Sequence, residues 1–309
     1  MNKHSAAATA AAFLIIAAAA TAFAGGTRDA AAAAGGKPTV VVSILPQKYF
    51  VSRIAGNRAA VEVLVGPGQN PHSYEPTPRQ MATLAGADAW ILSKTDFELA
   101  LVPKITALYP KLALVDGTEG VAFRLMEEHG HEDEDENHEE EAEGGNLDRH
   151  TWLGREPALI LAARVRDVLI GIDYAGRSVY EAGYAALAAD INREFDALTA
   201  DLAPLRGKTV FVYHPAFGYF LDEFGIRQEA VETGGKEPSP KALAALIEKA
   251  RAEGAPAVFV QAQFPTGAAK TVADAVGAQV VLLDDLAPDW LENIRRMGTA
   301  LAAAARSAR

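Results

Sequence analysis

The stretch that decides the fold is Ser178–Leu202, which reads SVYEAGYAALAADINREFDALTADL. It contains no proline, and its large apolar residues recur at spacings of three and four: Tyr180, Tyr184, Leu187, Ile191, Phe195 and Leu198. This period predicts one amphipathic helix of about seven turns. Such a helix is roughly twice as long as the mean of about eleven residues. We therefore assign residues 173–205 to a rigid helix that joins two folded units, rather than to an ordinary crossover helix.

Short runs of β-branched and apolar residues alternate with helix-length segments on both sides of this helix. The runs are residues 39–44, 61–65, 89–92 and 112–115 before it, and 210–213, 228–231, 257–260 and 280–283 after it. This alternation predicts an α/β fold with two lobes, each a mainly parallel sheet flanked by helices. We assign residues 38–172 to the N-terminal lobe and 206–309 to the C-terminal lobe, and we expect each lobe to bury its own core.

The first residues are typical of an exported protein. Lys3 precedes an uncharged apolar run that ends in the small-x-small pattern Ala22-Phe23-Ala24, so residues 1–24 are predicted to be a cleavable signal peptide. The alternative, a transmembrane anchor, would need a basic stop-transfer cluster after the run. Residues 25–37 predict a flexible leader. The chain has no cysteine, so we expect a periplasmic protein with neither a lipid-modified cysteine nor disulfides.

The net charge of −11 comes from one segment. Residues 127–143 contain eleven Asp and Glu and no Lys or Arg; removing these eleven from the 40 acidic residues leaves 29, equal to the 29 Lys and Arg. The remainder is therefore neutral, and nothing in it indicates a nucleic-acid partner. Residues 127–145 are of low complexity and are predicted to be a disordered acidic loop.

Three histidines lie where a crevice between two lobes would form. Outside the signal peptide and the acidic loop, the chain has only His72, His150 and His214. Each lies in a loop or directly after a predicted strand, and Asp284 ends the strand at 280–283. Open α/β sheets bind ligands beyond the carboxyl ends of their strands, so we expect these loops to meet.

Three imidazoles and one carboxylate form a donor set that suits tetrahedral Zn²⁺. Taken singly, a loop histidine is more often a surface or hydrogen-bonded residue than a ligand. Asp284 has a structural alternative as the N-cap of the following helix, and its neighbour Asp285 competes for both roles.

Six motifs, in order, resemble the zinc-specific solute-binding proteins of bacterial metal ABC importers. They are NPHSYEPTP, DRHTWL, VYHPAFGYFLDEFGI, GKEPSPKALAALIEKA, VFVQAQF and LLDDLAPDWLENI, and the likeness runs from Pro38 to Leu301. The resemblance implies two lobes joined by one long helix. It also implies that His72, His150, His214 and Asp284 ligate one tightly bound zinc ion. Zinc captured in the periplasm would then be delivered to an ABC permease of the inner membrane for uptake.

The third ligand position separates zinc from manganese in this resemblance. Manganese importers usually place Glu there, a harder oxygen donor, so His214 favours zinc. Manganese or broad divalent-metal binding remains the alternative. Glu75, Gln261 and Gln263 are candidates for orienting the imidazoles, although they could equally be surface or loop-capping groups. The Asp-Pro that often precedes the second histidine in this family is Asp148-Arg149 here.

The acidic loop carries His129, His131 and His138. Such a histidine-bearing insertion recurs at this position in the zinc-specific relatives. Imidazoles among carboxylates can hold divalent cations weakly, so the loop is a candidate collector or sensor of zinc. The alternative is a solvated loop with no role in uptake.

Two other classes of function compete with transport. In a zinc hydrolase, three histidines would leave a water position open and Glu75 or Asp284 would act as base. Four protein donors would close that position, so we expect a binding protein that is not an enzyme. We also expect it to be a monomer. The third class is an adhesin or structural protein of the envelope, since the resemblance extends to a cell-adhesion family. Such a protein would bind no stoichiometric, tightly held metal.

Overall fold

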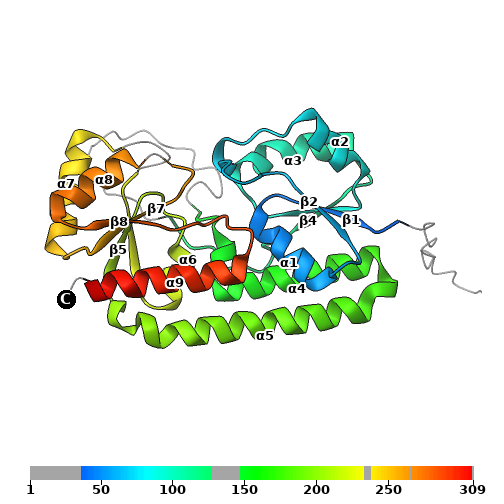
Figure 1. Ribbon diagram of the computed structural model, residues 1–309. Helices are drawn as coiled ribbons and strands as arrows, with labels where there is room; N and C mark the ends of the chain where they lie inside the picture. Colours follow the sequence, from blue (N-terminus) through cyan, green and yellow to red (C-terminus); the bar gives the residue numbers. More distant parts are fainter. Residues whose placement is uncertain (1–35, 127–146, 233–237, 265, 308–309) are drawn as a thin grey trace, which may run out of the picture. The chain divides into compact units, whose positions relative to one another are not determined.

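The computed structural model describes residues 36–126, 147–232, 238–264 and 266–307. The predicted signal peptide, nearly all of the predicted leader and the predicted acidic loop with His129, His131 and His138 lie outside these residues. The ranges that are described contain both predicted lobes and the helix between them (Figure 1).

The first sheet has four parallel strands in the order β2-β1-β3-β4. These are β1 (Thr39–Val42), β2 (Ala60–Val63), β3 (Ala89–Leu92) and β4 (Ala113–Asp116). The central strands β1 and β3 are almost wholly buried, which is why they read as unbroken apolar runs. The connecting helices are α1 (Leu45–Ala55), α2 (Pro78–Gly86) and α3 (Asp96–Leu108). Thr77 and Gln80 form a capping box that begins α2, with Pro78 at its first position.

The second sheet repeats the same topology, in the order β6-β5-β7-β8. Its strands are β5 (Thr209–Val212), β6 (Arg227–Ala230), β7 (Ala257–Val260) and β8 (Gln279–Leu282), all parallel. Its helices are α6 (Gly218–Glu223), α7 (Pro240–Ala252), α8 (Gly267–Val276) and α9 (Trp290–Ser307). The predicted α/β fold with two mainly parallel sheets is therefore confirmed.

The predicted long helix is also confirmed. Helix α5 (Arg177–Leu202) has 26 residues, and the 3-10 turns Tyr174–Gly176 and Ala203–Leu205 flank it. It follows α4 (Arg155–Ile172) in an antiparallel pair and also packs against α1 and α9 (Figure 1). The apolar residues that predicted it, including Tyr180, Leu187 and Phe195, are buried.

We expected each lobe to bury its own separate core, but one hydrophobic core is shared between the lobes. One cluster of buried side chains extends from β1 and β3 through α1, α4 and α5 to α9 and one face of the second sheet. Trp290 of α9 joins the ends of this cluster, since its ring lies 4.9 Å from that of Phe50 in α1. A second cluster fills the other face of the second sheet under α7 and α8. Residues 37–309 accordingly form one compact unit.

The carboxyl ends of the strands carry the polar residues of interest. The segments that follow β2, β3, β5, β6, β7 and β8 contain, in turn, His72, Asp96 (the first residue of α3), His214, Glu232, Gln261 and Asp285. Within the described ranges, no helix combines the length and the apolar character needed to cross a membrane.

Candidate metal centre

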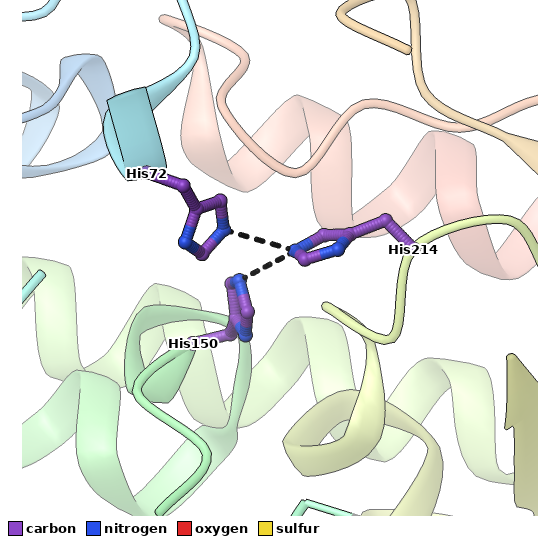
Figure 2. Close-up of side chains that lie close together, drawn as sticks. All are labelled: His72, His150 and His214. Carbon is purple, nitrogen blue, oxygen red and sulfur yellow. Dashed lines mark hydrogen bonds between the residues drawn. The ribbon is translucent and has the colours of Figure 1, made fainter. Parts of the chain in front are cut away.

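The three predicted histidines converge on one point (Figure 2). The Nε2 atom of His214 lies 3.1 Å from Nε2 of His72 and 3.1 Å from Nε2 of His150. In the described part of the chain, these are the residues whose potential ligand atoms lie close enough together to hold a metal ion, all within 4.8 Å of one another. The sequence separates them by up to 142 positions, so only the fold brings them together.

His72 lies on a short 3-10 turn, Pro71–Ser73, in the loop after β2. Asn70 begins this turn, because its Oδ1 accepts a hydrogen bond of 2.9 Å from the backbone N–H of His72. The Nδ1 of His72 is 2.7 Å from Oδ2 of Asp96, the first residue of α3. Both side chains are partly open to solvent, with 38% of His72 and 52% of Asp96 exposed.

His150 precedes the 3-10 turn Thr151–Leu153 and is buried. Its Nδ1 lies 2.8 Å from Oδ1 of Asp148, which also accepts a hydrogen bond of 3.0 Å from the backbone N–H of His150. Asp148 is fully buried. The ring of Trp152 lies 5.4 Å from that of His150, edge to face. The sequence around His150 therefore supplies both its anion and its packing.

His214 follows β5 and is also buried. Its Nδ1 lies 2.8 Å from Oε1 of Glu232, which follows β6 and is itself buried. Gln261, after β7, brackets the backbone of His214: it accepts from the N–H at 3.3 Å and donates to the carbonyl at 2.9 Å. Phe264 stacks on the imidazole at 4.7 Å.

Each histidine thus presents its Nδ1 to a carboxylate. A carboxylate only accepts, so the pairing places the proton on Nδ1 and leaves a lone pair on Nε2. The Nε2 atom of His214 lies 3.1 Å from each of the other two, and all three lie within 4.8 Å of one another, an arrangement that a cation between them would stabilise. Zn–N bonds of about 2.0–2.1 Å at tetrahedral angles put neighbouring nitrogens about 3.3–3.4 Å apart. The observed spacing therefore fits a single small metal ion.

Burial and the carboxylates shift the pKa values of the site in different directions. Burial lowers the pKa of His214 to about 4, which keeps this ring neutral and able to bind metal. Burial also lowers the pKa of His150, but the hydrogen bond and charge of Asp148 outweigh it, and the net shift is upward. The pKa of Asp96 is lowered, chiefly by the hydrogen bond from His72.

A pocket of about 20 Å³ opens beside the three rings, which is room for one ion or one water. Asp285 lines this pocket, is 5% exposed, and has an Oδ1 atom that is buried without a hydrogen-bond partner. Burial raises the pKa of Asp285 to about 6. Asp284 does not line the pocket, because its Oδ1 instead accepts a hydrogen bond of 2.9 Å from the backbone N–H of Leu286. Of the two adjacent aspartates weighed in the sequence, Asp285 lines the pocket and Asp284 does not.

The three residues predicted to orient the imidazoles have different positions. Gln261 holds the backbone of His214, as described above. Gln263 lines the pocket, and its buried Oε1 has no hydrogen-bond partner. Glu75 is exposed and does not line the pocket, so the group beside His72 is Asp96 instead.

Sequence reasoning missed the three carboxylates Asp96, Asp148 and Glu232. Two of them could have been found by the rule that located the histidines, since Asp96 and Glu232 closely follow predicted strands. Asp148 lies two residues before His150, a spacing that allows an Asp side chain to reach a neighbouring backbone N–H.

Comparison with known proteins identifies the family of the chain. The sequence model of the family described as "Zinc-uptake complex component A periplasmic" matches residues 40–304. The chain is 28% identical over 254 residues to the zinc-binding lipoprotein AdcA of Streptococcus pneumoniae, covering 81% of this chain and 50% of AdcA. It therefore spans about half the length of the AdcA relatives that it matches.

Solved structures share both fold and sequence with the chain. A crystal structure of ZnuA superimposes with a TM-score of 0.79 at 32% identity, covering 87% of this chain and 100% of ZnuA. The solute-binding protein FpvC of Pseudomonas aeruginosa, solved with Mn²⁺, shares the fold at a TM-score of 0.72 and 22% identity, covering 89% of this chain and all of FpvC. The family match covers nearly all of both lobes, and the chain belongs to the family of the periplasmic component A of zinc-uptake complexes.

Proposed function

We propose that this chain captures one Zn²⁺ ion in the periplasm and delivers it to an ABC permease of the inner membrane. The observation that carries the proposal is the convergence of three Nε2 atoms whose opposite ring nitrogens are each paired with a carboxylate. Paired in this way, the histidines have their tautomers and orientations set before the metal arrives. The ion is the cargo of the protein, and no bond of a substrate is broken.

The choice of zinc rests on the donor atoms. Three imidazole nitrogens suit Zn²⁺, whereas Mn²⁺ prefers oxygen ligands. The relatives AdcA and ZnuA are a zinc-binding protein and the zinc-uptake component, and a ZnuA deletion mutant has been solved with zinc bound. FpvC, solved with Mn²⁺, supports only the shared fold. Manganese binding is the second candidate, because proteins with this fold include one that binds Mn²⁺.

For the fourth donor we propose a carboxylate of the pair Asp284-Asp285. Asp285 is favoured, because it lines the pocket and its buried Oδ1 has no hydrogen-bond partner. Neither residue belongs to the close group of three histidines, so a small movement of the loop after β8 would accompany binding. A carboxylate in this position would close the coordination shell, which separates a transport site from a hydrolytic one.

The remaining parts of the proposal concern organisation. We propose a signal peptide over residues 1–24, a leader over 25–37, lobes over 38–172 and 206–309, and a linking helix over 173–205. The chain would act as a monomer that binds no nucleic acid. The acidic loop at 127–145, with His129, His131 and His138, would collect zinc near the site.

Competitive titration tests the proposal. The metal-free chain is titrated with Zn²⁺ and, separately, with Mn²⁺ against a chromophoric chelator, and the same chain without residues 127–145 serves as a control for weak binding by the loop. We expect one tight zinc ion per chain in both proteins, with zinc preferred over manganese by at least tenfold. Equal affinity for the two metals would reject the zinc assignment.

A further inference from the structure

Asp148, the carboxylate paired with His150, belongs to a group of four residues that reaches helix α6 of the other lobe. We call Arg124, Asp148, Tyr219 and Asp222 the α6 clamp. The hydroxyl of Tyr219 donates a hydrogen bond of 2.9 Å to the backbone carbonyl of Asp148 and accepts one of 3.1 Å from the backbone N–H of Arg124. Arg124 donates from Nη1 to Asp148 at 2.9 Å and from Nε to Asp222 at 3.0 Å. The clamp thus joins residues of both lobes.

The close approach of the two lobes at this point is built into the sequence. A Cβ atom on Gly218, the first residue of α6, would overlap the guanidinium of Arg124. A Cβ atom on Gly154 would lie 2.9 Å from Cβ of Tyr219. Glycine at both positions lets the guanidinium and the phenol ring fit against the opposite backbone.

The clamp connects to the metal centre on both sides, through a hydrogen bond to His150 on one side and through the chain that follows His214 on the other. Asp148 holds Arg124 through Oδ2 and the Nδ1 of His150 through Oδ1. Arg124 and Asp148 are further joined by a backbone hydrogen bond of 2.9 Å from the Asp148 N–H to the Arg124 carbonyl. On the other side, α6 begins four residues after His214. Moving α6 away from the clamp would therefore carry His214 away from His150.

The two limbs of the clamp differ in strength. Asp222 is 56% exposed, so its ion pair with Arg124 is screened by solvent and salt. Tyr219, by contrast, satisfies two backbone groups, one of them on the fully buried Asp148. Leaving such groups without partners is costly, so the tyrosine hydroxyl is the stronger limb.

We propose that the α6 clamp holds the two lobes together around captured zinc, so that release of the ion requires Tyr219 to leave the backbone of Asp148 and Arg124. This inference rests on the proposed function. Tyr219 and Arg124 are positioning residues, since they touch the metal ligands' supports and not the ion. Because linkage is reciprocal, whatever separates α6 from this segment lowers zinc affinity, and bound zinc resists the separation.

The test measures zinc release and zinc capture separately. Stopped-flow mixing of the zinc-loaded chain with excess chelator gives the dissociation rate, and mixing metal-free chain with zinc gives the association rate. We expect Tyr219→Phe to release zinc about tenfold faster, at the lower end of effects for groups that support metal ligands, with little change in association. Asp222→Asn should release zinc only a few times faster, and high salt should remove the difference from the wild type.

Two controls separate the clamp from a general loss of structure. Arg53→Lys alters another ion pair, with Asp190 between α1 and α5, that does not contact the metal centre, and it should release zinc at the wild-type rate. The visible spectrum of bound Co²⁺ should be unchanged in Tyr219→Phe, because all ligands remain.

Three results would contradict the inference. A dissociation rate within twofold of the wild type in Tyr219→Phe would reject the clamp. An altered Co²⁺ spectrum, with capture slowed as much as release is accelerated, would show that Tyr219 shapes the ligands instead. A wild-type chain that holds no zinc at all would reject the proposed function, and the clamp with it.

Discussion

The two ends of the metal centre are built differently. His150 and His214 are buried with their carboxylates, and each receives additional support from an aromatic ring. His72 lies on a three-residue turn, and it and Asp96 remain partly exposed. All three Nδ1–carboxylate distances are nevertheless within 2.7–2.8 Å.

The difference indicates that the buried pairs and the exposed pair contribute differently to metal binding. The buried pairs are fixed by packing, so little ordering is needed when the metal binds. The exposed pair stands at the solvent side, where an arriving ion would shed water. We therefore expect affinity to depend more on the buried end, and the predictions below test that asymmetry in order of decreasing effect.

Loss of a buried ligand should have the largest effect. Zinc binding in structural sites is worth about 10–16 kcal/mol, or about 2.5–4 kcal/mol for each of four ligands. His214→Ala and His150→Ala should therefore weaken zinc binding about 1000-fold, and His72→Ala, at the exposed end, about 100-fold. Chelator competition measures all three. Equal losses in the three variants would remove the asymmetry.

Removal of zinc should lower thermal stability. At a free zinc concentration of 100 times Kd, binding stabilises the folded chain by about 2.7 kcal/mol. For a protein of this size that corresponds to a melting temperature about 4–5 °C higher. Differential scanning calorimetry with and without chelator should show this shift in the wild type and none in His214→Ala at the same zinc concentration. A shift that persists in His214→Ala would place the stabilising ion elsewhere.

The carboxylates should follow the same ranking as the histidines. Groups that orient metal ligands typically contribute 10–100-fold to affinity. Glu232→Gln, in the buried pair, should approach 100-fold, whereas Asp96→Asn should lose only about tenfold. Glu75→Gln, which changes an exposed carboxylate outside the pocket, is the matched control and should bind zinc as the wild type does. A larger loss in Asp96→Asn than in Glu232→Gln would reverse the ranking.

The smallest expected effect distinguishes the two neighbouring aspartates. Asp285→Asn should weaken zinc binding a few times to about tenfold, since one oxygen donor to the metal is replaced by a weaker one. Asp284→Asn should change affinity less than twofold, because the Asp284 side chain accepts from the backbone of its own loop. Zinc titration of both variants decides between them. A loss confined to Asp284→Asn would restore the assignment made from the motif.

The fold was accessible to sequence reasoning because its central strands are buried on both faces. Runs such as Ala89–Leu92 and Ala257–Val260 read as continuous apolar segments, and the long helix showed its period plainly. Element ends shifted by one or two residues. The shared core was not predictable, because the contact between Trp290 and Phe50 joins residues 240 positions apart that no local pattern connects.

The site was only partly accessible. The three histidines could be named because they are rare outside the acidic loop and lie at loops. Their carboxylate partners could not be chosen among 40 acidic residues without knowing which loops meet. Asp284 and Asp285 are adjacent and chemically identical, so only the conformation of the loop after β8 shows that Asp285 lines the pocket and Asp284 does not.

One measurement tests the central claim most directly. Zinc K-edge X-ray absorption is recorded on the 1:1 zinc complex of the chain without residues 127–145, which removes the histidines of the acidic loop from consideration. The account predicts a shell of nitrogen and oxygen at about 2.0–2.1 Å with the outer-shell scattering of three imidazoles, falling to two in His150→Ala. An oxygen-only shell, or a spectrum unchanged in His150→Ala, would contradict it.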